Sequence, residues 1–420
     1  IKDNTIRKYD VEIKHVNGTI SDVADYIVEY LVKLNLNSPV LLFTNTRGEA
    51  EFLASILKEK SPISVELHHG SLSQQVREET EDNLKSGRSR LVVCTSSLEL
   101  GLDIGSVELV MHYGSPRQVS KFMQRIGRSK HNKHSSAKGL IVTNNVDDEL
   151  ETKAILERIH EGSIEDQLIH DGSLDVLAHH LVGLSMQIGS MSVSDALEIF
   201  RNSFLFRNLT LDDLIGVLEL LESNYLIFFD KEKMTFKKTA KCYRYYFENL
   251  STIPDILKFK VFDSVSKKII GSLDQRFVGD FGDPGNIFVL RGSQWRIINV
   301  DESSLKVNVE PIHSGGITVP YWEGENIPVD YKTTSKVGKF RSKIRDGSLV
   351  LPDNIITQLE LQIIPDNKTI VIESVRGQGM IVIHSCYGTK TNSTLATLLS
   401  SMLSSKTGLQ VDARSDAYRI

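Results

Sequence analysis

The stretch that decides the fold is RLVVCTSSLELGLDIG, residues 90–105, in which an apolar run leads directly into a polar loop with two glycines. The run LVVC shows no alternation of apolar and polar residues, as is typical of a strand buried on both faces of a parallel sheet. Related runs stand on both sides of it, separated by amphipathic stretches: PVLLFTN, ISVELHH, VELVMHY and GLIVT. This βαβ order predicts an α/β domain whose parallel sheet is covered by helices on both faces.

The pattern changes twice farther along the chain. Three stretches open on Ser or Thr and predict short N-capped helices: SLDVLAHHLVGL, SVSDALEIF and TLDDLIGVLELLESN. YLIFF and MTFKK, joined by DKEK, predict a β-hairpin, so this segment has the pattern of a winged helix. Short strand-like runs then predict a β-rich domain, a barrel or sandwich, whose tail holds a helix at 392–405 and a last strand near LQVDA. The predicted domains are 1–147, 148–252 and 253–420.

Composition excludes several classes of protein. With 420 residues, 40% hydrophobic and 25% charged, the chain is expected to fold into several cores, and no apolar run reaches the roughly 18 residues of a membrane helix. The net charge of −5 means that any nucleic-acid binding must come from local patches. The three cysteines lie far apart, which predicts neither disulfides nor a zinc site and fits a reducing cytosol. The chain starts at Ile1 without a leader, so we expect an excised piece of a longer protein.

The basic stretch KFMQRIGRSKH, residues 121–131, is the strongest local signal. Arg125 and Arg128 lie three residues apart, with a glycine between them that allows a sharp turn. Guanidinium groups bind phosphate with two hydrogen bonds and stay charged, so the pair suits the γ-phosphate of a nucleotide. The alternative is a solvated basic loop, because seven basic residues between 117 and 138 have no acid among them.

Polar loops follow the other predicted strands in the same way. Thr95, Gly101 and Asp103 follow LVVC and offer a hydroxyl, close backbone approach and a carboxylate, at the strand ends where α/β folds bind ligands. An ordinary polar loop is the alternative. The pair His68 and His69 suggests a metal at first sight, but adjacent residues of a strand point to opposite faces, so no metal site is predicted.

In order and spacing, FTNTR, HHGSLS, TSSLELGLD and QRIGRSKH resemble motifs IV, IVa, V and VI of superfamily 2 helicases. Further stretches resemble the Lhr (large helicase-related) family within it: YYFENLSTIPD, PYWEGE, YGTKTNSTLATLLSS and DARSDAYRI. The resemblance implies a second RecA-like domain, a winged helix and a β-rich accessory domain. His131 replaces the last arginine of the longer HRxGRxxR form, which leaves two arginines to face phosphate.

The resemblance also implies roles for single residues. Arg125 and Arg128 would sense or stabilise the γ-phosphate of ATP, and Gln124, Gly101 and Asp103 would line the nucleotide. Contacts with the DNA backbone would come from Thr44, Arg47, His69, Gly70 and Thr95. Ile253 at a domain junction suits an apolar wedge between bases, and Trp322 suits a stacking platform, with simple packing as the alternative for both. Trp295 is expected in the core.

The P-loop lysine and the acidic box of the first RecA-like domain have no counterpart here. GTKT at 388–391 lacks the preceding glycine at P-loop spacing, and DDE at 147–149 comes after motif VI, too late in the order to be the magnesium-binding box. ATP and Mg²⁺ would thus require the first RecA-like domain of the same polypeptide, and this chain alone is expected to be inactive.

The expected function is that of an ATP-dependent helicase, part of which is this chain. It would track 3′ to 5′ on single-stranded DNA and unwind tailed duplexes, in DNA repair, in the nucleoid-containing cytoplasm of a bacterium or archaeon. Two alternatives stay open: a helicase of RNA or RNA–DNA hybrids, and a non-catalytic nucleic-acid-binding module.

Overall fold

The structure is a computed structural model that describes residues 9–35, 38–99, 107–129, 137–167, 169–253, 257–312, 320, 326–349, 364–375, 377 and 379–420. Its contacts divide the chain into two compact units. The first comprises Ile1–Glu165 together with Leu257–Ile420, and the second is Asp166–Ile256. The predicted division at residues 147 and 252 stays a prediction. No helix among the described residues is both long and apolar enough to cross a membrane.

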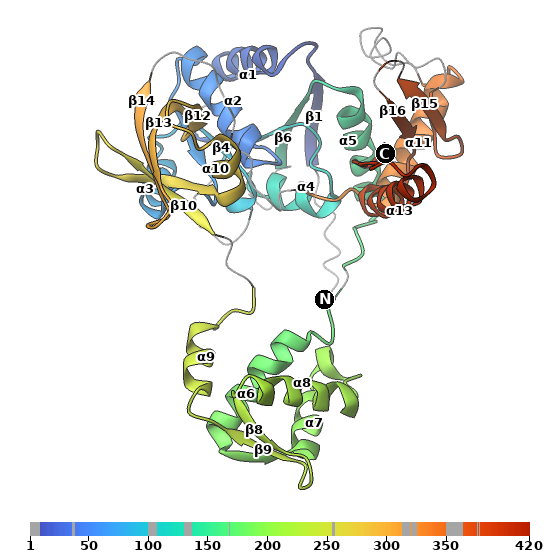
Figure 1. Ribbon diagram of the computed structural model, residues 1–420. Coiled ribbons are helices and arrows are strands. Elements are labelled where there is room, and N and C mark those ends of the chain that lie inside the picture. The colour runs from blue at the N-terminus through green and yellow to red at the C-terminus, as the bar shows by residue number, and fades with distance from the viewer. Residues whose placement is uncertain are drawn as a thin grey trace. The chain divides into compact units, whose positions relative to one another are not determined.

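A six-stranded parallel sheet forms the centre of the first unit (Figure 1). Its order is β1-β6-β5-β2-β4-β3, and neighbouring strands are parallel throughout. The strands are Tyr9–His15 (β1), Val40–Phe43 (β2), Val65–His68 (β3), Leu91–Cys94 (β4), Leu109–Tyr113 (β5) and Ala137–Thr143 (β6). Every residue of β2 and β4 is buried, which confirms the prediction drawn from their unbroken apolar runs.

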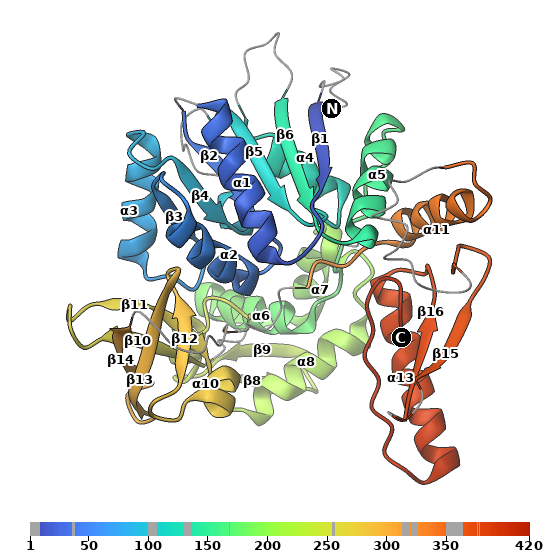
Figure 2. The same ribbon diagram turned by 90° about the horizontal axis from the view of Figure 1, so that it is seen from above.

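Helices cover both faces of this sheet (Figure 2). They are Ile20–Leu34 (α1), Arg47–Lys60 (α2), Gln74–Lys85 (α3), Val119–Ile126 (α4) and Val146–His160 (α5). Capping boxes start α1 and α2, where Thr19 and Thr46 accept backbone N–H groups while Asp22 and Glu49 reach back to the cap. These reciprocal bonds fix where each helix leaves its loop, and so where the preceding polar loop lies.

The β-rich segment after residue 257 is a curled five-stranded sheet of order β11-β10-β14-β13-β12. Its elements are Lys258–Asp263 (β10), Ile269–Asp274 (β11), the helix Gln275–Phe281 (α10), Ile287–Leu290 (β12), Ser293–Asp301 (β13) and Lys306–Ile312 (β14). Trp295 lies in the core as predicted, 7% exposed, and its indole N–H donates to the Leu290 carbonyl over 2.7 Å. Phe259, Val261 and Leu273 share one hydrophobic core with α1 and α2, so this sheet is docked on the parallel sheet's helical layer.

The loop between β3 and α3 extends the curled sheet by a short strand-like segment. Ser272 N–H donates to the Ser71 carbonyl over 2.8 Å, and Ser73 N–H donates to the Ile270 carbonyl over 3.3 Å. Leu72 and Gly271 form an antiparallel bridge between these bonds. A Cβ at Gly271 would lie 2.8 Å from the Ser71 carbonyl oxygen, so only glycine permits this approach.

A buried carboxylate on α2 completes the docking. Glu51 is fully buried, and it accepts the backbone N–H groups of Arg291 over 2.9 Å and Gly292 over 2.6 Å. Both residues have positive φ, 58° and 61°, as a two-residue type I′ hairpin between β12 and β13 requires. The His69 Nε2 atom donates to the same carboxylate over 2.8 Å. Glu51 therefore ties the helicase-like loop HHGSLS to the accessory sheet.

The C-terminal segment packs on α5 with a small core of its own. It comprises Tyr331–Arg345 (α11), the hairpin Val371–Val375 (β15) and Met380–His384 (β16), and Thr389–Thr407 (α13). The predicted last strand near LQVDA is wrong. Val411 N–H instead bonds to the Ser404 hydroxyl and its carbonyl to the Ser400 hydroxyl, so serines of α13 take the backbone groups that a strand partner would need.

The second unit has the fold of a winged helix. Its elements are Leu174–Ile188 (α6), Ser190–Ser192 (β7), Val193–Arg201 (α7), Leu211–Ser223 (α8), Ile227–Asp230 (β8), Thr235–Lys238 (β9) and Cys242–Glu248 (α9). The three strands form an antiparallel sheet of order β7-β9-β8 against the helices. Ser192 and Thr210 cap α7 and α8 as predicted, whereas Ser173 makes no side-chain cap bond.

We predict that Glu51→Ala lowers the free energy of unfolding by about 3–5 kcal/mol, because three buried N–H donors would lose their acceptor. Urea unfolding of the chain measures this. Glu59→Ala, at an exposed position of the same helix, is the control and should change stability by less than about 0.5 kcal/mol. A similar small loss for both variants would contradict the docking role of Glu51.

Candidate functional site

The candidate site lies at one edge of the parallel sheet. β2, β3, β4 and β5 end at this edge, and polar residues follow each of them because the carboxyl ends of parallel strands lie together. Thr44 comes after β2, His69 after β3 and Thr95 after β4. The sequence thus brings the predicted loops to a common edge.

Arg125, on α4, is the centre of this edge. Its side chain is 1% exposed, and its Nε atom donates to Glu99 Oε1 over 2.8 Å. The Nη1 atom donates to Asn45 Oδ1 over 3.0 Å, and the guanidinium lies 5.6 Å from the centre of the Phe43 ring. Burial lowers the pKa of Arg125 and the Glu99 carboxylate opposes this shift, so the guanidinium stays charged.

His112, on β5, holds the same guanidinium from another side. Its Nδ1 atom donates to the Gly114 carbonyl over 2.9 Å, so the Nε2 atom is left to accept from Arg125 Nη1. Burial, and then the charge of Arg125, lower the pKa of His112 well below its usual value. The ring is therefore neutral and acts as an acceptor at neutral pH.

Glu99 connects the two motifs that contain the predicted phosphate-binding residues. Besides Arg125, its carboxylate accepts Lys121 Nζ over 2.5 Å. Its backbone carbonyl accepts Arg128 Nε over 3.0 Å and Arg128 Nη2 over 2.5 Å. One residue of SLELGLD thus orients both arginines of QRIGRSKH. Sequence reasoning missed Glu99, although the sequence contained a signal for it. A buried arginine in a basic stretch that has no acid of its own needs a carboxylate from another segment, and Glu99 is the acid in the neighbouring loop.

The remaining predicted nucleotide residues are placed as follows. Gln124 is half-buried on α4. Gly101, Asp103 and His131 lie outside the described residues. The arginines of QRIGRSKH are therefore brought together with Glu99, and their relation to Gly101 and Asp103 stays a prediction.

Two of the predicted DNA-contacting residues of the first unit, Arg47 and His69, belong to one connected network. Arg47 Nη1 donates to the Ser71 hydroxyl over 2.6 Å, and Ser71 N–H donates to His69 Nδ1 over 3.2 Å. His69 is fully buried with its other nitrogen on Glu51. His68 turns the opposite way, to Ser97 and Glu81, as the alternation of a strand requires.

The other predicted contacts differ in exposure. Thr44 is fully buried, and its hydroxyl donates to the Thr46 carbonyl over 2.9 Å. Thr95 is 6% exposed, Gly70 is exposed, and Ile253 is 78% exposed. Trp322 lies outside the described residues.

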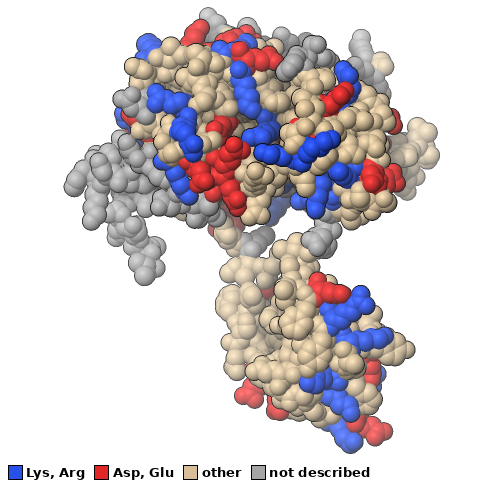
Figure 3. Space-filling view, turned by 90° about the vertical axis from the view of Figure 1, so that its left-hand side faces the viewer, with Lys and Arg blue, Asp and Glu red and all other residues tan. Residues whose placement is uncertain are grey.

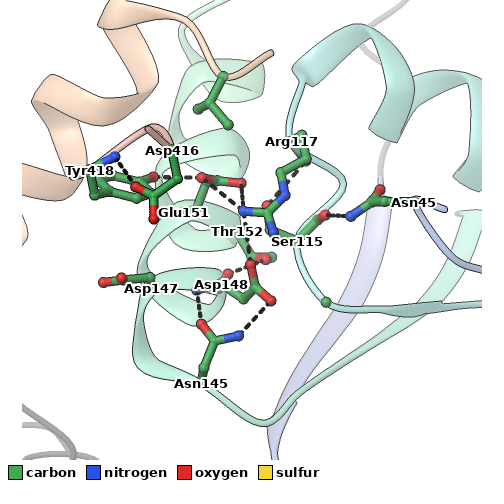
Figure 4. A network of polar contacts seen from close by, with 12 residues as sticks. Asn45, Ser115, Arg117, Asn145, Asp147, Asp148, Glu151, Thr152, Asp416 and Tyr418 are labelled. Carbon is green, nitrogen blue, oxygen red and sulfur yellow. Dashed lines mark hydrogen bonds and ion pairs between the residues drawn. The ribbon is translucent and has the colours of Figure 1, made fainter. Parts of the chain in front are cut away.

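A polar network around Arg117 adjoins the network around Arg125 and was missed by sequence reasoning (Figure 4). Arg117, at a positive φ of 67°, contacts Asp148 Oδ1 over 3.0 Å and Glu151 Oε1 over 3.2 Å. The hydroxyl of Tyr418 donates to Glu151 Oε2 over 2.5 Å. Burial raises the pKa of Glu151, and Arg117 opposes the shift. The acids of DDE, dismissed as a magnesium box, thus belong to ion pairs of α5.

The network around Arg125 and the network around Arg117 meet at Asn45. Its Oδ1 atom accepts from Arg125, and its Nδ2 atom donates over 2.8 Å to the carbonyl of Ser115, which stands two residues before Arg117. Asn45 also lines a cavity of about 540 Å³ between α5 and the C-terminal segment, together with Arg117, Arg341 and Tyr418. The hydrogen bonds of Asn45 therefore connect the two networks directly.

We predict that His112 makes stability depend on pH. The folded state keeps His112 neutral, whereas the unfolded chain binds a proton below about pH 6.5. Stability should therefore fall as the pH drops from about 6.5, by up to about 1.4 kcal/mol per pH unit. Urea unfolding at pH 7.5 and 5.5 should show a smaller difference for His112→Gln than for the parent chain. The control is His160→Gln, at an exposed site of α5; an equal effect of both variants would exclude the role of His112.

Three family models match the chain in order. The helicase conserved C-terminal domain matches residues 22–133, the winged-helix domain of large helicase-related protein matches 157–316, and the DEAD/H associated domain matches 364–420. Together they cover β2 to β5 of the parallel sheet, the second unit, the curled sheet, and the C-terminal segment from residue 364 onward.

Curated relatives match over most of the chain. It is 32% identical over 361 residues to ATP-dependent helicase Lhr-Core protein 2 of Thermococcus barophilus, covering 81% of this chain and 41% of the relative. It is 30% identical over 432 aligned positions to ATP-dependent helicase Lhr-Core of Methanocaldococcus jannaschii, covering 94% of this chain and 50% of the relative. The chain thus spans half or less of the length of these relatives.

Solved structures share the fold. The Mycobacterium smegmatis helicase Lhr, bound to ssDNA and AMP-PNP, matches with a TM-score of 0.69 and 24% identity over 98% of this chain and 54% of that one. The DUF1998 helicase MrfA, bound to DNA, matches with a TM-score of 0.56 and 20% identity over 72% of this chain and 42% of that one. The ordered domain models, the Lhr-Core relatives and this fold show that the chain belongs to the Lhr (large helicase-related) family of superfamily 2 helicases.

Proposed function

We propose that the chain is the part of an ATP-dependent helicase that tracks 3′ to 5′ on single-stranded DNA and unwinds tailed duplexes, in DNA repair in the nucleoid-containing cytoplasm. The observation that carries the proposal is that Glu99 fixes Arg125 and Arg128 at the edge where the strands of the parallel sheet end. The relatives are helicases by name, and the related Lhr and MrfA structures hold DNA.

The residues at this edge fit an anionic nucleotide. Arg125 Nη2 is buried without a hydrogen-bond partner among the described residues, and a buried donor of this kind has a strong need for an acceptor. A phosphate oxygen would supply it. In the proposal, the first RecA-like domain of the same polypeptide binds most of ATP and Mg²⁺. Arg125 and Arg128 reach the γ-phosphate from this chain, with Gln124, Gly101 and Asp103 beside the nucleotide.

The division of labour between the two arginines follows from their bonds. Arg125 is enclosed by Glu99, Asn45 and His112 and has little freedom to move. Arg128 is half-buried, whereas Arg125 is 1% exposed, and the Glu99 carbonyl oxygen accepts both the Nε and the Nη2 atom of Arg128. Because Arg128 is the more accessible of the two and is already oriented by the Glu99 carbonyl, it is the better candidate to stabilise charge that develops on the transferring phosphoryl group.

The DNA strand would be held by Thr44, Arg47, His69, Gly70 and Thr95, with Ile253 and Trp322 from the other domains. Because both nitrogens of the His69 ring are engaged, its contact would come from the peptide groups of the loop. Backbone contacts of this kind carry no base sequence. An RNA–DNA hybrid is therefore a further possible duplex, provided that the tracking strand is DNA.

The direction and the strand preference can be tested with the longer polypeptide that includes the first RecA-like domain. Tailed duplexes with matched DNA or RNA tracking strands, and with a 3′ or a 5′ tail, are compared for ATP-dependent unwinding. We expect unwinding only from a 3′ DNA tail. Faster unwinding from an RNA tail, or from a 5′ DNA tail, would reject the proposal in its present form.

In the same polypeptide we predict that Arg128→Ala lowers ATP turnover by about 10³-fold or more, whereas single-strand affinity changes less than about twofold. The reason is that the guanidinium would contact the nucleotide and not the strand. Arg88→Ala, at an exposed arginine of the same domain, is the control and should retain turnover. Normal ATP turnover together with lost DNA binding in Arg128→Ala would mean that this residue contacts the DNA strand and not the nucleotide.

A further inference from the structure

The wing of the second unit, by which we mean residues 225–249, carries three lysine–aromatic pairs. Each lysine Nζ atom lies over the ring of a neighbouring Tyr or Phe, between 4.9 and 5.4 Å from its centre. The pairs are Lys237 with Phe228, Lys238 with Tyr243, and Lys241 with Tyr225. All six side chains are exposed. We call these six residues the lysine–aromatic surface.

The fold of the hairpin accounts for the position of these residues but not for their type. Phe228 and Lys237 are register partners of β8 and β9, and the alternate residues Phe229 and Phe236 fill the core. The hydroxyl of Thr239 donates to the carbonyls of Tyr225 and Leu226 and fixes the turn toward α9. Exposed aromatic rings contribute nothing to that core, and an exposed cation–π contact contributes only about 0.5–1 kcal/mol.

The charge of the wing differs from that of the whole chain. Residues 225–249 contain six basic and three acidic residues, although the chain carries a net charge of −5. Three of the basic residues pair with acids: Lys231 with Glu219, Lys233 with Asp230, and Arg244 with Glu248. In the part of the chain that the structure describes, the three lysines of the lysine–aromatic surface have no carboxylate partner. Figure 3 shows lysine and arginine side chains on the right-hand side of this unit, with acidic side chains among them.

We propose that the lysine–aromatic surface binds single-stranded DNA, as a contact separate from the residues assigned above. The three lysines would neutralise phosphates, and the exposed rings would stack on bases. Aromatic stacking requires base faces that a duplex hides within its helical stack, which favours a single strand. Since an exposed lysine can swing from a ring to a phosphate, each pair offers both contacts. This inference rests on the proposed function, from which the single strand comes.

The test compares two triple variants of the chain that remove the same charge. Lys237→Ala/Lys238→Ala/Lys241→Ala removes the lysines without a carboxylate partner, and Lys231→Ala/Lys233→Ala/Arg244→Ala removes the acid-paired residues of the same wing. Binding of a fluorescent oligo(dT) is measured by anisotropy over a series of salt concentrations. We expect the first variant to bind about tenfold more weakly at low salt and its salt slope to fall by about 2, at about 0.7 per phosphate contact. The second variant should bind within about twofold of the parent.

A third variant, Phe228→Ala/Tyr243→Ala, separates stacking from charge. It should weaken oligo(dT) binding several-fold without changing the salt slope, because the lysines remain. Circular dichroism of all variants reports whether the wing stays folded. An unchanged affinity here, with a folded wing, would reject stacking on this surface.

Other outcomes overturn the inference in distinct ways. Equal loss in both triple variants would mean a general charge effect, and a loss confined to blunt duplex DNA or to oligo(rU) would assign the surface to another ligand. If the parent chain binds oligo(dT) and no variant differs from it, the surface has no such role while the proposed function stands. If the parent chain binds neither oligo(dT) nor tailed duplex, the proposed function itself fails.

Discussion

The buried ion pair between Glu99 and Arg125 is the interaction on which the candidate site depends. Both side chains are at most 2% exposed, so the cost of removing two charges from water is offset only by close bonding. Glu99 supplies that bonding from the loop after β4, and Asn45 and His112 supply it from the loop after β2 and from β5. Two well-packed apolar side chains in place of Glu99 and Arg125 would stabilise the fold as well. What the charged pair adds is one fixed orientation of the loop that carries Arg128.

A similar arrangement joins the parallel sheet to the curled sheet. There a single carboxylate, Glu51, accepts from a histidine of one layer and from two peptide groups of the other. The loop that holds His69 also holds Ser71, the partner of Arg47. The accessory sheet is therefore continuous with the residues proposed to hold the strand. Such continuity provides a physical route between the two.

Local patterns in the sequence predicted the elements, and long-range polar contacts decided the site. The unbroken apolar runs LLF and LVVC predicted buried parallel strands, and DKEK between two apolar runs predicted the wing. The motif loops were placed at the correct edge because βαβ connections make the strands parallel, so that their carboxyl ends lie together. Glu99, Glu51 and the Arg117 network were missed, since each pairs with residues 18 or more positions away, as in the contacts of Glu51 with His69 and Gly292. LQVDA was misassigned because side-chain hydroxyls replaced the expected strand partner.

The strand-like segment at Leu72 strictly limits insertions and deletions in this part of the chain. Leu72 is 3% exposed and points into the shared core, while its neighbours bond to β11. Because side chains alternate along an extended segment, adding or deleting one residue in this loop would turn Leu72 outward and bring a serine into the core. Among Lhr proteins, the length of this loop should therefore vary far less than the identity of its exposed residues.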